Sequence, residues 1–262
     1  MYYKIEGKLV KIEPKDVERI IAVGDIHGDF YAFKKIEDLF DPNKDLLVFL
    51  GDYADRGPNS VEVIEGVQKL IQKYSKRIIA LKGNHEDYSD DGTPRFSPCT
   101  LIEEVERKRG SWSTYFKKLK KEFLDKLYLA ALIPESILFI HGGISDKIKS
   151  EDDLINPSRA VEEDILWSDP YEEKGEFYNP RGAGVLFGPD ISKKITERLN
   201  IKYIIRSHEP RKALFKPAVE HEGRVATISS TSVYGGKPFV LILPVKNLPK
   251  NSKEIENYVV FL

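Results

Sequence analysis

Four of the five histidines in this chain lie in short segments rich in glycine and polar residues, and each segment directly follows an apolar run. A fifth segment of the same kind has no histidine but carries two aspartates and an arginine. Polar groups that follow successive buried strands meet at one edge of an α/β sheet, so this pattern predicts a shared polar site. The segments are Gly24–Gly28 (GDIHG), Gly51–Gly57 (GDYADRG), Gly83–Glu86 (GNHE), His141–Gly143 (HGG) and Arg206–Glu209 (RSHE).

The first half of the chain alternates between short apolar runs and amphipathic segments. The apolar runs do not alternate with polar residues, which is typical of strands buried on both faces. The segments between them have apolar residues at helical spacing, and Asp29 is placed to cap the first one. We predict strands at 19–23, 46–50 and 78–81, and helices at 29–40 and 58–74.

The second half of the chain is predicted to be helical at first and then richer in strands. Residues 97–132 are predicted to be helical, and residues 145–190, which contain four prolines, are predicted to be rich in loops. Strands are predicted at 137–140, 203–205, 218–221, 225–229, 239–243 and 258–261, with a turn at Glu222-Gly223. The predicted buried face of the helical region is Leu101, Val105, Tyr115, Leu119, Phe123 and Leu127. The pattern predicts an α/β fold with helices flanking two packed sheets, a site along one edge, and one domain over residues 1–262.

Composition limits the classes of partner and compartment. The chain has 262 residues, a net charge of −1 and 41% apolar residues, so we expect a globular protein without nucleic acid or an anionic membrane as partner. A single cysteine excludes an internal disulfide and indicates a reducing compartment. The N-terminus lacks the apolar stretch of a secretion signal, and no apolar run approaches the roughly 20 residues of a membrane helix. We therefore expect a cytoplasmic protein, and the sequence leaves its oligomeric state open.

The side chains of the five segments match the ligands of borderline first-row metals. Asp25 and His27 are two residues apart in an extended stretch, so both can face the same way. Asp52 has two oxygens that could bridge two ions, while Asn84, His141 and His208 add an amide oxygen and two imidazoles. Mixed Asp, His and Asn ligation suits Mn, Fe or Zn, not Ca. Two such ions about 3.5–4 Å apart are used for in-line displacement at phosphorus.

Four further residues are candidates for catalysis. His85 follows Asn84 and should point away from it, towards a substrate whose leaving group it could protonate, and Asp55 is the candidate carboxylate that orients it. Arg56 and Arg181 could bind phosphate oxygens. Each residue alone is more often a turn, cap or surface residue, and only the joint pattern favours a site. His221, which has no such context, is predicted to be structural.

Other hydrolase classes lack their motifs here. Cys99 has no preceding histidine and is followed six positions later by Val105, so a cysteine-phosphatase loop is absent. The sequence also contains no nucleotide-binding loop of the Gly-x4-Gly-Lys-Ser/Thr type and no His-Glu-x-x-His zinc-protease motif.

The chain resembles the phosphoprotein phosphatases, the metal-dependent Ser/Thr phosphatases of the calcineurin-like metallophosphoesterase superfamily. It is most similar to their small prokaryotic or archaeal members. The resemblance covers about residues 20–235 and implies a four-layer αββα fold. It is carried by GDIHG, GDYADRG, GNHE, HGG and RSHE in this order, together with Leu166–Pro170 (LWSDP) and Arg181–Gly188 (RGAGVLFG).

The resemblance also implies roles for individual residues. Asp25, His27 and Asp52 would hold one divalent ion, and Asp52, Asn84, His141 and His208 would hold another, with Mn first and Fe or Zn as alternatives. Arg56, Asn84, Arg181 and His85 would contact the phosphate, with Asp55 orienting His85. A hydroxide bridging the metals would attack directly, without a phosphoenzyme. Tyr234 takes the place of the family tyrosine beside the site, but the surrounding Ser229–Gly236 departs from the family pattern Ser-Ala-Pro-Asn-Tyr-Cys-Gly.

Three functions remain open on the sequence. The first is hydrolysis of phosphomonoesters on phosphorylated serine and threonine proteins. The second is hydrolysis of diadenosine tetraphosphate, which shares the first three motifs but not the LWSDP and Arg181 segments. The third is a non-catalytic binding module, which the complete ligand set argues against.

Overall fold

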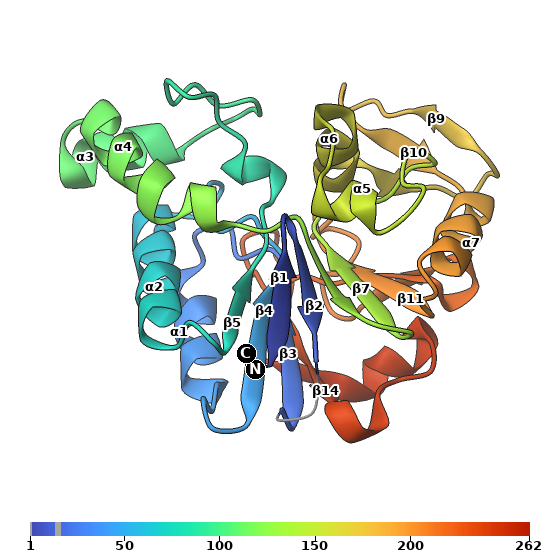
Figure 1. Cartoon of the computed structure of the whole chain (residues 1–262). Coiled ribbons are helices and arrows are strands. Elements are labelled where there is room, and N and C mark those ends of the chain that lie inside the picture. Colours follow the sequence, from blue (N-terminus) through green and yellow to red (C-terminus); the bar gives the residue numbers. More distant parts are fainter. Residues whose placement is uncertain (1, 14–16) are drawn as a thin grey trace.

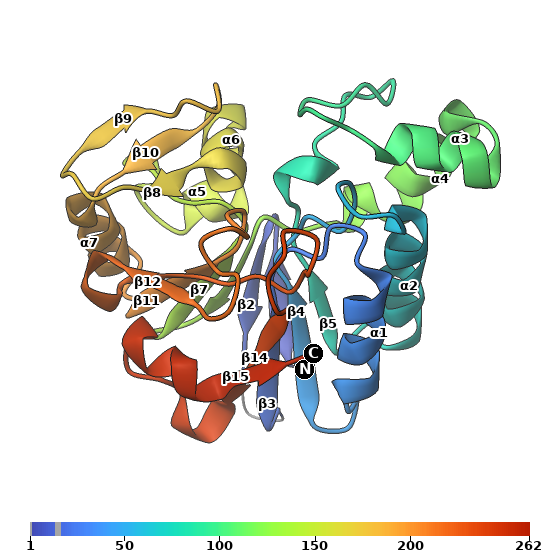
Figure 2. The same cartoon turned by 180° about the vertical axis from the view of Figure 1, so that it is seen from behind.

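Two sheets packed face to face form the centre of the molecule, with helices outside each of them (Figures 1 and 2). The structure is a computed structural model and describes residues 2–13 and 17–262. The larger sheet has, in spatial order, β1 (Tyr3–Glu6), β2 (Leu9–Ile12), β6 (Ala130–Ile133), β7 (Ile137–Ile140), β11 (Tyr203–Arg206), β13 (Val225–Thr227) and β12 (Ala218–Glu220). The other has β15 (Val259–Phe261), β14 (Phe239–Pro244), β3 (Arg19–Val23), β4 (Asp45–Phe49) and β5 (Ile78–Ala80).

Helices cover the outer face of each sheet, so the molecule has four layers (Figure 1). On the five-stranded sheet these are α1 (Phe30–Leu39) and α2 (Ser60–Lys73). Helix α3 (Leu101–Arg109) packs against α2, and α4 (Trp112–Glu122) packs against α3. On the seven-stranded sheet they are α5 (Asp152–Ile155), α6 (Arg159–Trp167) and α7 (Pro189–Arg198). Short 3-10 helices are η2 (Asn84–Glu86), η3 (Leu124–Lys126), η4 (His221–Gly223), η5 (Val245–Asn247) and η6 (Ser252–Tyr258). The predicted fold of helices around two sheets is confirmed.

The two-residue periodicity of strands explains why the apolar runs do not alternate with polar residues. In β3, Ile20 and Ala22 face the second sheet, whereas Ile21 and Val23 face the helices. Both faces are buried from Ile20 to Val23, so each of these positions is apolar. Asp29 caps α1 as predicted, because its side chain accepts a hydrogen bond from the N–H of Ala32 at 3.0 Å.

Some element predictions are wrong. Residues 97–132 are not one helical region, since α4 ends at Glu122 and β6 begins at Ala130. Residues 145–190 are not mainly loop, because they contain α5, α6 and a small sheet of β8 (Asp169–Pro170), β10 (Val185–Phe187) and β9 (Glu176–Tyr178). The β1–β2 hairpin and α7 lie where no element was predicted. The apolar residues of β6 fit a helix face as well as a strand, and only pairing with β2 and β7 decides between them.

The remaining predictions differ from the structure only at their ends. The last strand begins at Val259, and the predicted turn at Glu222-Gly223 lies within η4. The predicted buried face of α3, α4 and η3 belongs to the apolar core that includes the outer face of the five-stranded sheet. Among the helices of the described residues, none has the length and apolar composition needed to span a bilayer.

Candidate metal centre and catalytic cleft

Nine of the eleven predicted site residues lie on loops that follow five strands with neighbouring C-terminal ends; Arg181 follows β9 and Tyr234 follows β13. The loops after β3, β4 and β5 come from one sheet, and those after β7 and β11 from the other. Parallel pairing of β3 with β4, β4 with β5, and β7 with β11 puts the ends of each group at the same edge. The two groups are joined by an isolated parallel bridge between Asp25 and Ser229.

The backbone of this region adopts a conformation that L-residues rarely occupy. His27, Asp52, Asp55, Arg56 and His208 all have positive φ, between 48° and 69°. Each such residue costs on the order of 1–3 kcal/mol, and residues of this kind gather at functional sites. The loops therefore adopt a strained backbone conformation that directs their side chains into the site.

Two histidines donate hydrogen bonds from Nδ1 to backbone carbonyl oxygens. His27 Nδ1 lies 2.9 Å from the oxygen of Ala54, and His141 Nδ1 lies 2.9 Å from the oxygen of Leu50. A carbonyl only accepts, so each ring donates there, and in the neutral ring Nε2 carries a lone pair. Burial lowers the pKa of His27 to about 3 and the pKa of His141 well below its usual value, so both rings are neutral.

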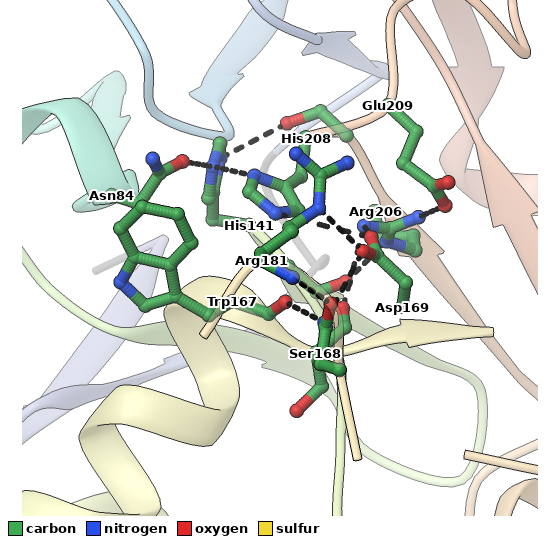
Figure 3. Close-up of polar contacts among 12 residues, drawn as sticks. Asn84, His141, Trp167, Ser168, Asp169, Arg181, Arg206, His208 and Glu209 are labelled. Atoms are coloured by element: carbon green, nitrogen blue, oxygen red, sulfur yellow. Dashed lines mark hydrogen bonds and ion pairs between the residues drawn. The ribbon is translucent and has the colours of Figure 1, made fainter. Parts of the chain in front are cut away.

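These lone pairs face other electron-pair donors. His27 Nε2 lies 3.4 Å from Asp52 Oδ2 and 4.0 Å from Asp25 Oδ2. His141 Nε2 lies 3.0 Å from Asn84 Oδ1 and 3.2 Å from His208 Nδ1 (Figure 3). It also lies 3.4 Å from Asp52 Oδ1. Lone pairs repel one another without a proton or a cation between them. The geometry therefore defines two places where a bound cation would relieve this repulsion, and Asp52 faces both of them.

The charged forms of the buried carboxylates are also disfavoured by desolvation. Burial raises the pKa of Asp25 to about 6 and raises the pKa of Asp52 well above its usual value, where the neighbouring carboxylates add to the effect. Asp25 Oδ2 and His208 Nε2 are buried with no hydrogen-bond partner among the described residues. Divalent cations would reverse these penalties, since they favour the ionised carboxylate and the neutral imidazole. The donor set fits a pair of first-row divalent metal ions.

His85 and Asp55 form a buried pair beside the metal centre. His85 Nδ1 lies 2.8 Å from Asp55 Oδ2, so the opposite nitrogen is left for a ligand. The other Asp55 oxygen accepts hydrogen bonds from the N–H groups of Thr100 at 2.6 Å and Leu101 at 2.8 Å, at the start of α3. Burial acts to raise the pKa of Asp55, but His85 and these N–H groups outweigh it and lower that pKa. Asp55 thus orients His85 from a rigid helix terminus.

A chain of charged side chains positions Arg181 at the mouth of the site (Figure 3). Arg206 is completely buried and donates to Asp169 Oδ1 at 2.9 Å, to the carboxylate of Glu209 and to the carbonyl of Gly142. The other Asp169 oxygen accepts from Arg181 Nε at 2.7 Å. This bond occupies one side of the Arg181 guanidinium and leaves the rest of it towards the cleft.

The site opens to solvent through a cleft of about 690 Å³. Arg56 and Arg181 line it together with His85, Asn84 and Tyr234. The Tyr234 ring lies 5.6 Å from the His27 ring, centroid to centroid, and burial raises the pKa of its hydroxyl to about 12. All eleven residues predicted for the site thus lie in or directly beneath one cleft, whereas His221 is bonded to Ser192 and Tyr171 elsewhere.

Sequence reasoning missed three positioning residues, Glu86, Asp169 and Arg206. The Glu86 carboxylate accepts hydrogen bonds from the N–H groups of Asp52 at 2.8 Å, Tyr53 at 3.1 Å and Gly83 at 3.0 Å, and so ties together the loops after β4 and β5. All three lie inside the motifs quoted above, so the motifs themselves carried the signal. Their function is to hold backbone and side chains in place, which residue type alone does not show.

Replacing Glu86 by Gln is expected to destabilise the protein by about 1–3 kcal/mol, because an amide cannot satisfy three N–H donors as a carboxylate does. Urea unfolding of the metal-free protein measures this loss. The control is Glu197→Gln, an exposed carboxylate on α7, which should change stability by less than about 0.5 kcal/mol. Equal stability of the two variants would show that Glu86 does not hold the loops together.

The model of the calcineurin-like phosphoesterase family matches residues 18–212, which is most of the chain. The chain belongs to the calcineurin-like phosphoesterase family. It is therefore a phosphoesterase by family, and the cation places formed by Asp52 with His27 and with His141 and His208 agree with the divalent metals that these phosphoesterases use.

Several solved structures share this fold. A protein serine/threonine phosphatase from Saccharomyces cerevisiae with similarity to human phosphatase PP5 is 26% identical, with a TM-score of 0.79 over 98% of this chain and 82% of that chain. A cold-active protein-tyrosine phosphatase of a psychrophilic Shewanella species is 15% identical, with a TM-score of 0.61 over 94% and 80%. A protein proposed to be a diadenosine tetraphosphatase is 15% identical, with a TM-score of 0.53 over 98% and 97%. The latter two show the fold alone.

Proposed function

We propose that this phosphoesterase is a metal-dependent protein serine/threonine phosphatase that hydrolyses phosphomonoesters. Asp25, His27 and Asp52 would hold one divalent cation, and Asp52, Asn84, His141 and His208 would hold the other. We propose manganese as the native metal, with iron or zinc as alternatives. Bound there, the two cations would activate a water molecule for direct attack and neutralise phosphate charge.

The chain's own residues supply binding and proton transfer. Arg56 and Arg181 lie on the cleft wall, where their guanidinium groups can bind the phosphate oxygens as forks. His85, held through Nδ1 by Asp55, donates a proton from Nε2 to the leaving serine or threonine oxygen. Without that proton the alkoxide is a poor leaving group, so His85 matters most for alkyl esters.

The observation that carries this proposal is the Arg206–Asp169–Arg181 chain of ion pairs. It joins the LWSDP segment to the RGAG segment and holds Arg181 over the cleft. From the sequence, a diadenosine tetraphosphate hydrolase is expected to share the first three motifs but not these two segments. The 26% identity and TM-score of 0.79 to the yeast protein serine/threonine phosphatase support the same choice.

We further propose that residues 1–262 form one catalytic domain that acts on phosphorylated proteins in the cytoplasm. The net charge of −1 gives no reason to expect nucleic acid or an anionic membrane as partner. The alternative function is hydrolysis of diadenosine tetraphosphate, for which one structural neighbour is proposed.

Chelator-stripped protein is expected to be inactive and to regain activity with Mn²⁺, with smaller recovery for Fe²⁺, Zn²⁺ or Mg²⁺. Removing both cations removes the nucleophile and most charge neutralisation, so the loss should be at least roughly 10³-fold in kcat. The assay compares a phosphoserine peptide, a phosphothreonine peptide, a phosphotyrosine peptide and diadenosine tetraphosphate. A higher kcat/KM for the phosphoserine or phosphothreonine peptide than for the other two supports the proposal. A higher kcat/KM for diadenosine tetraphosphate would contradict the proposal and support the alternative function.

A further inference from the structure

A second groove, also of about 690 Å³, lies at the side of the sandwich where the end strands of the two sheets are neighbours. Strands β1 and β5 are next to each other at the front of Figure 1, and both contribute to it. No residue lines both this groove and the catalytic cleft. Its walls are mainly apolar and aromatic, from Tyr3, Ile5, Ile71, Ile78, Leu127 and Tyr128.

Strand β1 presents a free backbone edge to this groove. The Glu13 N–H donates to the Tyr2 oxygen at 2.8 Å, and β1 pairs with β2 in the antiparallel register that brings Lys4 opposite Lys11. Bonded pairs alternate in such a ladder, so Lys4 and Glu6 bond to β2 while the N–H and C=O groups of Tyr3 and Ile5 point away from it. β1 is the last strand of its sheet, so these groups meet no further strand in the described chain.

The backbone of β5, at its C-terminal end, is already hydrogen-bonded to the segment before β6. The Tyr128 N–H donates to the Ala80 oxygen at 3.1 Å, and the Lys82 N–H donates to the Tyr128 oxygen at 2.7 Å. The segment before β6 therefore closes the top of β5. A chain entering the groove has β1 as the edge to pair with. The opposite wall is formed by the apolar side chains of β5 and by Leu127 and Tyr128.

Positive charge surrounds the groove. Lys4, Lys8, Lys76 and Lys126 are all exposed and line it, against a single carboxylate, Asp125. Asp125 pairs with Lys120, and Lys4 pairs with Glu6. Over residues 2–13 and 17–262, Lys8, Lys76 and Lys126 have no ion-pair partner. The groove thus has an excess of unpaired cations around an apolar floor.

We propose that this groove binds an extended acidic segment of a partner protein, which adds to the edge of β1 as a further strand. Its backbone would pair with Tyr3 and Ile5, alternate apolar side chains would pack on the aromatic floor, and Asp or Glu residues would face the lysines. A second copy of the chain is a poor occupant, because a two-fold pairing of β1 with β1 would bring the rim lysines of the two copies, Lys8, Lys76 and Lys126, towards one another. The site gives the phosphatase a contact with protein partners away from the cleft.

The test uses a fluorescein-labelled octapeptide that alternates Glu with Val and Ile, and a matched peptide with Lys in place of Glu. Fluorescence anisotropy is expected to show saturable binding of the acidic peptide only, weakening as salt is added. Hydrogen exchange is expected to show protection of the Tyr3 and Ile5 amides when the acidic peptide is bound. Hydrolysis of p-nitrophenyl phosphate reports the catalytic cleft and should not change.

Two kinds of variant make the test specific. Reversing two rim charges with Lys76→Glu and Lys126→Glu should raise the Kd of the acidic peptide by roughly tenfold or more, whereas Lys193→Glu on α7 should leave it unchanged. Ile5→Pro removes an outward N–H that β2 does not use, so the hairpin should persist and peptide binding should be lost. Three results would overturn the proposal: no saturable binding at about 1 mM peptide, binding unchanged in all variants, or a dimer that dissociates on Ile5→Pro.

Discussion

Asp52→Asn is expected to lower kcat by roughly 10³-fold or more while making the metal-free protein more stable. Asp52 faces both cation places, with Oδ2 3.4 Å from His27 Nε2 and Oδ1 3.4 Å from His141 Nε2. An amide has one oxygen and cannot bridge, so both cations would bind weakly. In the metal-free state the amide nitrogen can instead donate to an imidazole lone pair, and a buried carboxylate whose pKa is raised by its surroundings is removed.

The two effects are measured separately. Steady-state kinetics with a phosphoserine peptide and Mn²⁺ gives kcat, and thermal unfolding in chelator gives the stability of the metal-free protein. Asp38→Asn on the exposed face of α1 is the matched control and should change neither. Activity close to that of the unaltered protein would contradict the bridging position of Asp52. A metal-free variant that unfolds at lower temperature would contradict the view that the cluster is strained without cations.

His85→Asn is expected to impair hydrolysis in proportion to how poor the leaving group is. For a phosphoserine peptide we expect kcat/KM to fall by roughly 10²–10⁴-fold, the usual contribution of a general acid. For p-nitrophenyl phosphate we expect kcat/KM to fall by less than about tenfold. Nitrophenolate leaves without protonation, and the variant does not alter the cations and arginines. Kinetics on both substrates with saturating Mn²⁺ measures the contrast.

Asp55→Asn serves as the companion variant. Since Asp55 acts through His85, the same contrast between substrates should appear, only smaller. This variant should also lose stability, because the hydrogen bonds from the N–H groups of Thr100 and Leu101 to Asp55 Oδ1 would no longer be made to a charged acceptor. If His85→Asn lowers kcat/KM equally for both substrates, His85 binds phosphate and is not the acid that protonates the leaving group.

Local sequence was enough to find the site because each motif is short and self-contained. A polar residue placed directly after an apolar strand has little freedom in where it goes, since the strand end determines its position. Asp25 with His27, and Asn84 with His85, follow this rule, and all lie in one cleft. The positive φ of His27 and Asp52 belongs to the same short loops, although residue type alone did not reveal it.

Elements without a local signal were the ones predicted wrongly or missed. The Ala130–Ile133 run is apolar throughout, so it fits a helix face or a strand equally well until β2 and β7 pair with it. The 145–190 region was predicted as loop because of its prolines, yet α6 and the sheet of β8, β9 and β10 lie between them. In both cases contacts with distant segments outweigh local propensity.

The sequence by itself determined the family, the kind of fold and the set of side chains that meet in the cleft, because these depend on residue types at strand ends. Only the tertiary structure decided how those side chains are held. Glu86 ties its loop to one 34 residues away, and Asp169 meets Arg206 across 37 residues. The free edge of β1 beside β5 is likewise a product of how the two sheets end. Such contacts join residues without any periodic relation along the chain, so no local pattern records them.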